Sequence, residues 1–251
     1  MPKPIALVTN ADEFAGPAAV QSLQKADFQV VAHRRSHNVQ DESQWQAFLS
    51  SDVICITENS PVLLVEQIMA EHGQLDVVIS NDVHPAKHQT LETCSTGDLN
   101  SAMYALVTFP FELLKACLPH MKQRSTGSIV MITSCRTELP QSGGGLADMP
   151  RAAANALMKT ASIEFAEHNI AVNAIAPNYY YSEAYFPRKM FIDGEDGAAY
   201  IREQVPIGRL GDANELGDLI VYLANLRGAF HTGSIIKFSG GWPVGKPRPT
   251  F

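Results

Sequence analysis

The chain has 251 residues, of which 45% are hydrophobic and 18% are charged, and its formal net charge at pH 7 is -7. This length and composition allow a sizeable buried core, and the acidic balance argues against nucleic-acid binding. The longest apolar runs are well short of the about 18 residues that cross a bilayer, so no membrane span is expected. There is no signal-like apolar start, and the four cysteines show neither CxxC nor metal-like spacing, which predicts reduced thiols, no metal site and a cytoplasmic location.

Short apolar runs alternate with helical segments along the chain. Strands are predicted at residues 4–8, 28–33, 52–57, 75–80, 128–134, 170–176 and 234–238. Helices are predicted after the first strand, from Pro61 with Ser60 as its cap, and at residues 99–122, 151–168 and 212–225. Strict alternation requires crossover connections, so the predicted fold class is α/β: a doubly wound, Rossmann-like parallel sheet in three layers, forming a single domain over residues 1–251.

Ligands of such a sheet bind beyond the carboxyl ends of its strands. The segments to examine are therefore those that follow the strands, at residues 9–16, 33–35, 81–85, 134 onward and 177–181. Three motifs stand out: "ISND" ending on Asp82, "MITS" ending on Ser134, and the run 206–242 that ends in "SGGW". Together they resemble the short-chain dehydrogenase/reductase superfamily, and the resemblance covers nearly the whole chain.

The first turn departs from that superfamily, whose Thr-Gly-x-x-x-Gly-x-Gly pattern lets the backbone close on a pyrophosphate. Counted from Thr9, the glycine positions hold Asn10, Phe14 and Gly16. A phenyl ring at residue 14 would project into the cofactor cleft, unless the loop has merely diverged and buries the ring in the core. We therefore expect no dinucleotide cofactor. Residues Arg34 and Arg35 favour the opposite interpretation, because cations after the second strand can pair with a 2′-phosphate.

One branch of the superfamily, the halohydrin dehalogenases, resembles the reductases but uses no cofactor. The runs "TNADEFAGPAA", "SND" and "APNYYYSEAYFP" (176–187) are similar to its first turn, its fourth-strand turn and its halide-binding loop. The resemblance implies that small haloalcohols or epoxides and a halide bind to Phe14, Asp82, Pro177, Asn178, Tyr179, Tyr180 and Phe186. Electropositive ring edges suit a polarizable anion. The same aromatics could instead lie at the surface or in a subunit interface.

In that branch a Ser–Tyr–Arg set closes the epoxide: the tyrosine takes the proton of the hydroxyl, the serine holds the oxygen, and the arginine lowers the pKa of the tyrosine. Counted from Ser134, the arginine position holds Arg151, but the tyrosine position holds Ala147. Alanine cannot transfer a proton. Asp148 is adjacent, yet on a helix of 3.6 residues per turn it should point about 100° away. Both a natural loss of the phenol and a replaced tyrosine are compatible with the alanine.

Three functions remain open at this point. They are a dehalogenase-type lyase scaffold without its general base, an NADP-dependent oxidoreductase with an unusual turn, and a non-catalytic binding protein. The resemblance also implies a homotetramer, for which the predicted helices at 99–122 and 151–168 should expose small residues such as Ala154 and Ala161 for close helix packing.

Overall fold

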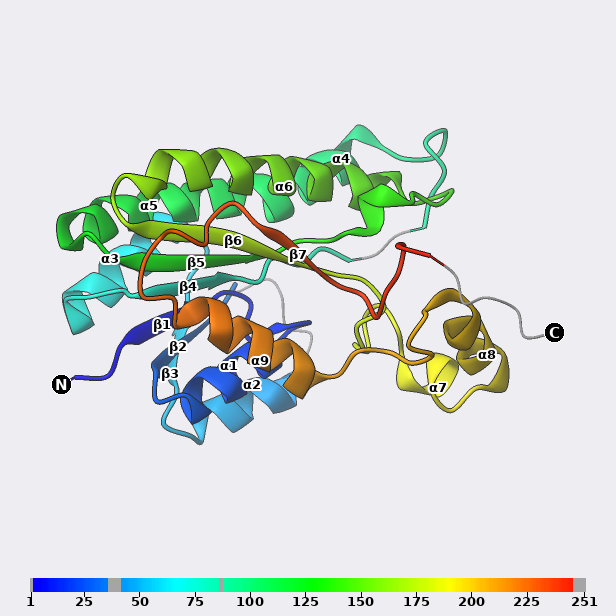
Figure 1. Ribbon diagram of the computed structural model, residues 1–251, viewed down its shortest axis with the longest axis horizontal. Coiled ribbons are helices and arrows are strands. Elements are labelled where there is room, and N and C mark those ends of the chain that lie inside the picture. Colours follow the sequence, from blue (N-terminus) through cyan, green and yellow to red (C-terminus); the bar gives the residue numbers. More distant parts are fainter. Residues whose placement is uncertain (1, 36–41, 86–87, 246–251) are drawn as a thin grey trace.

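A computed structural model describes residues 2–35, 42–85 and 88–245 of the chain. Its seven described strands form one parallel sheet in the order β3-β2-β1-β4-β5-β6-β7 (Figure 1). The strands are β1 (Ile5–Val8), β2 (Gln29–Arg34), β3 (Ile54–Thr57), β4 (Val77–Ser80), β5 (Gly127–Ile132), β6 (Ile170–Pro177) and β7 (Ile235–Phe238). The order reverses between β1 and β4, which is the switch point where ligands bind in such sheets. The predicted fold class is confirmed.

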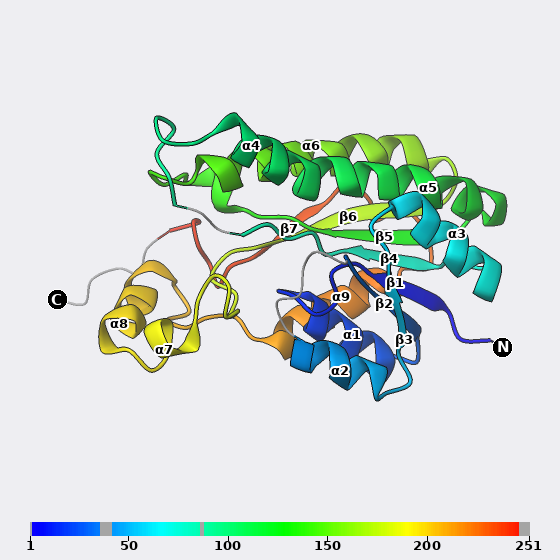
Figure 2. The ribbon, with the colours of Figure 1, turned by 180° about the vertical axis from the view of Figure 1, so that it is seen from behind.

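Two helical layers cover the faces of the sheet (Figures 1 and 2). One layer holds α1 (Gly16–Lys25), α2 (Glu42–Leu49) and α9 (Ala213–Ala224), and the other holds α3 (Pro61–His72), α5 (Phe109–Arg124) and α6 (Gly145–Ala166). Strand β1 shows why two layers form. Its side chains alternate, so Ala6 and Val8 pack against the first layer while Ile5 and Leu7 pack against the second.

The long helix of the second layer has the composition of a membrane span. It consists of α4 (Thr96–Met103), a π-helical turn η1 (Tyr104–Thr108) and α5, and it is long and apolar enough to cross a bilayer by length and composition alone. The sequence predicted a helix at 99–122 but no stretch of membrane-spanning length, because its uninterrupted apolar runs are short. Phe109, Leu113 and Cys117 are fully buried in the core, which accounts for the apolar character of this helix.

Helix α6 starts at Gly145, six residues before the predicted start. The amides of Ala147 and Asp148 both donate to the carbonyl of Gly144, at 3.0 and 2.9 Å, and these bonds form the first turn. Pro150 lies inside this helix, where it removes only one amide donor. The early start places Ala147 and Asp148 on a rigid element.

Contrary to the expectation from the sequence, the small residues of α6 are not exposed for helix packing between subunits. Ala154 and Ala161 are only 2% and 4% exposed, because they lie on the face that packs against the sheet. They follow the three- and four-residue spacing of Arg151, Met158 and the other buried positions of this helix. They are therefore not available for contacts between subunits.

A second set of elements lies beyond the carboxyl ends of the strands. It comprises a short 3-10 turn η2 (Arg136–Glu138) after β5 and the helices α7 (Arg188–Phe191) and α8 (Glu195–Gln204) in the long connection from β6 to α9. Figures 1 and 2 show α7 and α8 extending past the end of the sheet, away from the amino terminus. This extension supplies one wall of the cavity described below.

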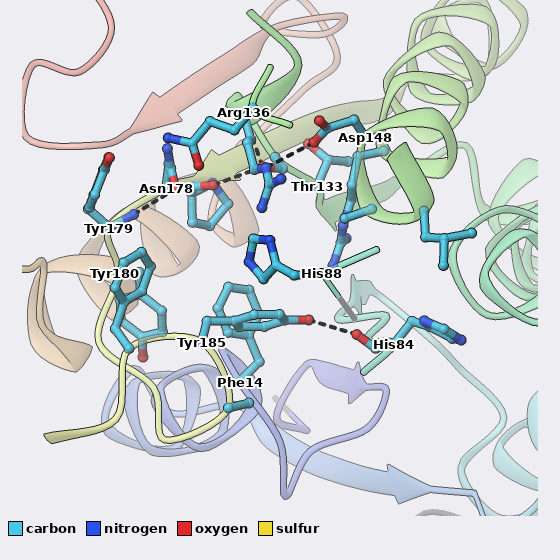
Figure 3. A pocket seen from close by; sticks show the side chains of 18 of the residues that line it. Phe14, His84, His88, Thr133, Arg136, Asp148, Asn178, Tyr179, Tyr180 and Tyr185 are labelled. Atoms are coloured by element: carbon cyan, nitrogen blue, oxygen red, sulfur yellow. Dashed lines mark hydrogen bonds and ion pairs between the residues drawn. The ribbon is translucent and has the colours of Figure 1, made fainter. Parts of the chain in front are cut away.

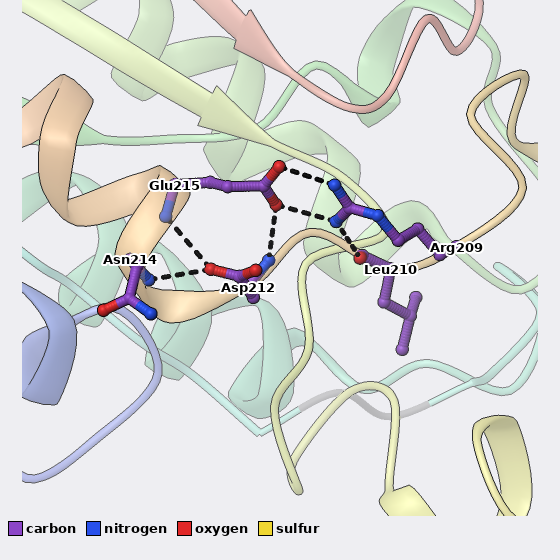
Figure 4. A network of polar contacts seen from close by, with 5 residues as sticks. All are labelled: Arg209, Leu210, Asp212, Asn214 and Glu215. Carbon is purple, nitrogen blue, oxygen red and sulfur yellow. Dashed lines mark hydrogen bonds and ion pairs between the residues drawn. The ribbon is translucent and has the colours of Figure 1, made fainter.

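The connection returns to the core through the capped start of α9 (Figure 4). The carboxylate of Asp212 accepts from the amides of Asn214 and Glu215, and the Glu215 carboxylate accepts from the Asp212 amide at 3.1 Å, which completes a capping box. Arg209 donates two bonds to Glu215, at 2.8 and 2.7 Å, and this pairing lowers the pKa of Glu215 to about 2. The network holds Gly211, whose amide and carbonyl pair with the segment after β6.

Candidate active site

A cavity of about 510 Å³ opens at the carboxyl ends of β5 and β6. Its wall includes Ser134 after β5, and Ala147 and Arg151 from the first two turns of α6. The structure thus brings together the three residues of the predicted catalytic set. Six of the seven predicted halide and substrate residues also line it: Phe14, Pro177, Asn178, Tyr179, Tyr180 and Phe186. Figure 3 shows how the labelled side chains of this cavity face one another.

The hydroxyl of Ser134 is held in a fixed orientation. Its Oγ donates to the carbonyl of Pro177 at 3.3 Å and accepts from the amide of Arg136 at 3.1 Å. A hydroxyl has one proton and two lone pairs, so one lone pair stays available to accept a bond from a ligand. Asn155, which the sequence did not single out, donates to the backbone carbonyl of Ser134 at 3.2 Å and supports this position.

Arg151 is a buried, immobilised cation. Its guanidinium donates to the carbonyls of Ile132 and Asp82, at 2.8 and 3.0 Å, and the residue is 8% exposed. Both acceptors are neutral, so the positive charge has no carboxylate partner in these bonds. A fixed cation at this place favours the ionised form of an acidic group in the cavity.

One predicted site residue, Asp82, is not among the described residues that line the cavity. Its carboxylate accepts from the hydroxyl of Ser80 and from Asn10, behind the cavity wall. Burial raises the pKa of this carboxyl from 3.8 to about 6, against the opposing effects of the Ser80 bond and of the Arg35 and Arg151 charges. Its contribution to the site is the backbone carbonyl that anchors Arg151.

The turn after β1 is closed by its own side chains. Phe14 has φ +46°, a backbone region that glycine adopts most easily, and its ring meets Tyr180 and Tyr185 edge-on with centroids 5.4 and 5.2 Å apart. The amides of Glu13 and Gly16 donate to carbonyls within the turn, so they do not point at a ligand. Phe14 therefore fills the space between the turn and the segment after β6 (Figure 3).

The two arginines after β2 are engaged elsewhere. Arg34 pairs with Glu42 at 2.9 Å and stacks on Trp45, while Arg35 donates to the side chain of Asn10 at 3.2 Å and lies over the ring of Phe109. Because the turn is closed and both arginines are engaged, the part of the chain that the structure describes offers neither the backbone cradle nor the free charged pair that a dinucleotide phosphate requires. The residues present do not fit a nicotinamide dinucleotide.

An aromatic wall follows β6. Tyr179 has φ +56°, its hydroxyl lies 3.2 Å from that of Tyr200, and its ring contacts Phe186 and Trp242 at centroid distances of 5.3 and 5.7 Å. Burial raises the pKa of Tyr179, and it raises that of Tyr180 to about 12. These phenols therefore stay protonated at neutral pH and do not supply the missing phenolate.

Several residues of the cavity were missed by the sequence interpretation. The most informative is Asp148, whose Oδ1 lies 3.0 Å from Nε of Arg136. The expectation that it points away was wrong. Helical side chains tilt toward the amino-terminal end, and the cavity is lined by the first turns of α6, so neighbouring positions both reach it. The lining residues His88 and Tyr200 lie in no sequence motif, whereas His84, Tyr185 and Trp242 lie in the segments 81–85, 176–187 and 206–242 but were not singled out there.

Comparisons with known proteins agree with this architecture. Residues 15–243 match the family model described as enoyl-(acyl carrier protein) reductase. Curated relatives include a tropinone reductase homolog from Arabidopsis thaliana, 27% identical over 95% of this chain and 92% of its own length. Another is the 3-oxoacyl-[acyl-carrier-protein] reductase of Escherichia coli (strain K12), 26% identical over 94% of this chain and 96% of its own length.

Solved structures bring a different activity into the comparison. A halohydrin dehalogenase bound to ethyl (2S)-oxiran-2-ylacetate is 32% identical, covers 98% of this chain and 100% of its own, and has a TM-score of 0.90. A second structure, titled a dehalogenation enzyme, is 28% identical over 96% of this chain and 98% of its own, with a TM-score of 0.88. The fold, the strand-end motifs and these matches show that the chain belongs to the enoyl-(acyl carrier protein) reductase family of the short-chain dehydrogenase/reductase superfamily.

Proposed function

We propose that the cavity converts a small vicinal haloalcohol to an epoxide and a halide, and that it also opens epoxides with small anions, without a cofactor. The observation that carries this proposal is the position of Phe14. Its ring lies edge-on to Tyr180 and Tyr185 inside the cavity that also contains Ser134 and Arg151. The ring takes up space that a dinucleotide would need, whereas ring edges offer an electropositive surface to a small anion, and both features support the proposal.

The residues present support most steps of such a reaction. Ser134 accepts a hydrogen bond from the hydroxyl of the substrate, because one of its lone pairs is available. Once the hydroxyl loses its proton, the oxygen attacks the neighbouring carbon, a C–O bond forms, and the halide leaves with the electron pair of the C–halogen bond. Phe14, Asn178 and Tyr180 surround the space that we assign to the halide. Arg151 stabilises negative charge as it develops.

A specific observation favours a second candidate. Ala147 places a methyl group where the branch that this chain resembles has a phenol, so the cavity could bind a small molecule without transforming it. A non-catalytic binding protein would keep the same cavity and the same halide affinity, and it would show no turnover. Turnover therefore separates the two candidates.

Fluorescence titration tests the binding part of the proposal. The chain has two tryptophans, and Trp242 lines the cavity while Trp45 lies under Arg34 outside it. In a Trp45→Phe variant we expect saturable quenching by bromide and no response to NADPH. In the matched Trp242→Phe variant only Trp45 fluoresces, and bromide should quench it by collision, in linear proportion to its concentration. Saturable binding of NADPH without bromide binding would favour an oxidoreductase, and a response to neither would overturn the proposal.

We also propose that the protein is a homotetramer. Ile163 on α6 and Phe111 on α5 are 78% and 45% exposed, and both lie on the outer side of one helical layer, where apolar exposure is typical of an interface. These residues replace the buried Ala154 and Ala161 as the expected contact positions. Light scattering at micromolar concentration should give four times the mass of the chain, and an Ile163→Glu variant should dissociate.

A further inference from the structure

Asp148 lies directly beside the position that lacks a proton acceptor. It follows Ala147 in the first turn of α6, it lines the same cavity, and its side chain is 15% exposed. The wall of this cavity also contains Ser134, which holds the substrate oxygen in the function proposed above. Among the described residues, no other carboxylate lines this cavity.

A fixed cation orients this carboxylate. Nε of Arg136 lies 3.0 Å from Oδ1 of Asp148, and the side chain of Arg136 is 22% exposed (Figure 3). The backbone amide of the same arginine donates to the Ser134 hydroxyl at 3.1 Å. One residue thus connects the hydroxyl that binds a substrate oxygen with the carboxylate across the cavity wall, which is the arrangement of a base held by a third group.

The charge around Asp148 suits proton transfer. Burial raises the pKa of this carboxyl above its ordinary value of 3.8, while the charges of Arg136 and of the neighbouring His88 limit the rise. A carboxylate whose pKa is brought closer to neutrality is a better proton acceptor than a fully solvated one. His88 lines the same cavity and is exposed.

We propose that Asp148 is the proton acceptor of this site, in the place of a phenol at residue 147, and that Arg136 is its positioning residue. The inference rests on the function proposed above. The carboxylate takes the proton of the haloalcohol hydroxyl while the oxygen forms the C–O bond and the halide leaves with its electron pair. The protonated Asp148 then returns its proton to water, which restores the starting charge.

The phenols of the cavity do not compete for this role. The hydroxyl of Tyr185 donates to the carbonyl of His84 at 3.1 Å, and the hydroxyls of Tyr179 and Tyr200 lie within 3.2 Å of each other. Burial raises the pKa of Tyr180 to about 12. The hydroxyl of Ser134 itself donates to the carbonyl of Pro177 at 3.3 Å, so its proton is already engaged.

Four proteins, the wild type and three variants, separate this inference from the function on which it rests. Halide release from a vicinal bromoalcohol is measured for the wild type, Asp148→Asn, Ala147→Tyr and the Ala147→Tyr/Asp148→Asn double variant. We expect Asp148→Asn to lower kcat about 10²–10⁴-fold with little change in KM, since general-base catalysis contributes a factor of that size. The double variant should keep the activity of Ala147→Tyr, which also shows that Asn at residue 148 does not prevent folding.

Each other outcome is informative. If Asp148→Asn releases halide as fast as an active wild type, Asp148 is not the base and the proposed function stands. If Ala147→Tyr releases halide while the wild type does not, Asp148 is not the base and the wild-type chain is the non-catalytic binding protein. If none of the four releases halide and bromide does not bind beside Trp242, the proposed function itself fails and the role of Asp148 falls with it.

The pH profile tests the role of Arg136. The rate should rise with pH through the pKa of Asp148, because only the carboxylate accepts a proton. Arg136→Gln removes the strongest charge that lowers this pKa, so the acid limb should move to higher pH. Glu138→Gln is the matched control, since Glu138 lies in the same turn and pairs with Lys237 outside the cavity. If the acid limb of the pH–rate profile stays at the same pH in Arg136→Gln, Arg136 does not position Asp148.

Discussion

The guanidinium of Arg136 occupies the space that a β-carbon at Gly144 would take: an ideal Cβ there would lie 2.0 Å from Nη2 of Arg136. The same Cβ would lie 2.7 Å from Oδ2 of Asp148. Gly144 has an ordinary backbone conformation, with φ -90° and ψ -3°, so conformational freedom is not the reason for glycine here. Its lack of a side chain allows the Arg136–Asp148 pair to cross the start of α6.

Gly144→Ala should therefore disturb the pair more than the fold. Arg136 is long enough to move away, but the Cβ would also lie 2.9 Å from the carbonyl oxygen of Gln141, so the backbone must shift slightly and we expect the free energy of unfolding to fall by about 1 kcal/mol. The acid limb of the pH profile for halide release should move to higher pH, as expected for Arg136→Gln. Gly145→Ala is the control, because a Cβ there meets only the tip of Leu91 at less than 3 Å. An unchanged limb in Gly144→Ala would argue against the coupling of the two residues.

Ala147→Tyr should give a phenol beside Arg151 and within reach of Ser134. The fixed cation lowers the pKa of that phenol, and a general base typically contributes about 10²–10⁴-fold to the rate. We expect halide release from a bromoalcohol to rise above that of the wild type. Adding Arg151→Ala should remove the gain, because the phenol loses its cation. NADPH-dependent carbonyl reduction by Ala147→Tyr, without halide release, would instead favour the oxidoreductase.

The closed first turn predicts that NADPH does not bind measurably. Phe14 packs between Tyr180 and Tyr185, and the amides of the turn are engaged internally. Isothermal calorimetry at tens of micromolar protein should show no binding heat. A low-micromolar dissociation constant would mean that Phe14 moves aside at little cost. A Phe14→Gly variant, which removes the ring and suits φ +46°, tests whether the turn alone can be reopened.

Acid should destabilise the protein through His33. Burial lowers the pKa of this imidazole from 6.5 to about 4, although its bond to the carbonyl of Glu58 opposes the shift. Between pH 6.5 and 4 the unfolded chain binds the proton and the folded chain does not, so the contribution of His33 to stability is lost as pH falls. At about 1.4 kcal/mol per pKa unit, the loss is on the order of 3 kcal/mol.

Asp82 should act in the opposite direction over nearly the same range. Its pKa rises from 3.8 to about 6 on folding, so the folded chain binds the extra proton and stability falls as pH rises through that interval. The two groups should nearly cancel between pH 4 and 6. Urea unfolding at pH 4.5, 5.5 and 6.5 should show a steeper acid loss in Asp82→Asn than in the wild type, and the reverse trend in His33→Gln. Parallel curves for all three proteins would contradict these shifts.

The cap of α9 should matter for stability and for the aromatic wall. Asp212→Ala removes the acceptor for two helix amides, and such a change costs about 1–2 kcal/mol. Asp212→Asn keeps an acceptor and should cost less than half as much. Because Gly211 pairs with the backbone of Tyr179 and Tyr181, the alanine variant should also weaken bromide binding beside Trp242. Equal unfolding energies for the two variants would show that the cap is not needed.

Much of the fold was predictable from local patterns. The alternation of apolar strands with helices specifies a doubly wound parallel sheet, because parallel neighbours need crossover connections. The start of α3 is also local: Pro61 is the first helical residue and the side chain of Ser60 accepts from the Leu63 amide, as the sequence predicts. The start of α6 was missed, because tertiary packing keeps residues 145–150 helical in spite of the glycines and Pro150.

The sequence by itself determined the architecture, the substitutions in the first turn, and the presence of Ser134 and Arg151 with alanine at residue 147. These features depend on residue type and spacing along the chain, which a sequence displays directly. Only the tertiary structure decided that Asp148 and Arg136 share the cavity, that Asp82 lies behind its wall, and that Ala154 faces the sheet. Those outcomes depend on where helices begin and which side packs inward, and such choices are made by contacts between segments far apart in the chain.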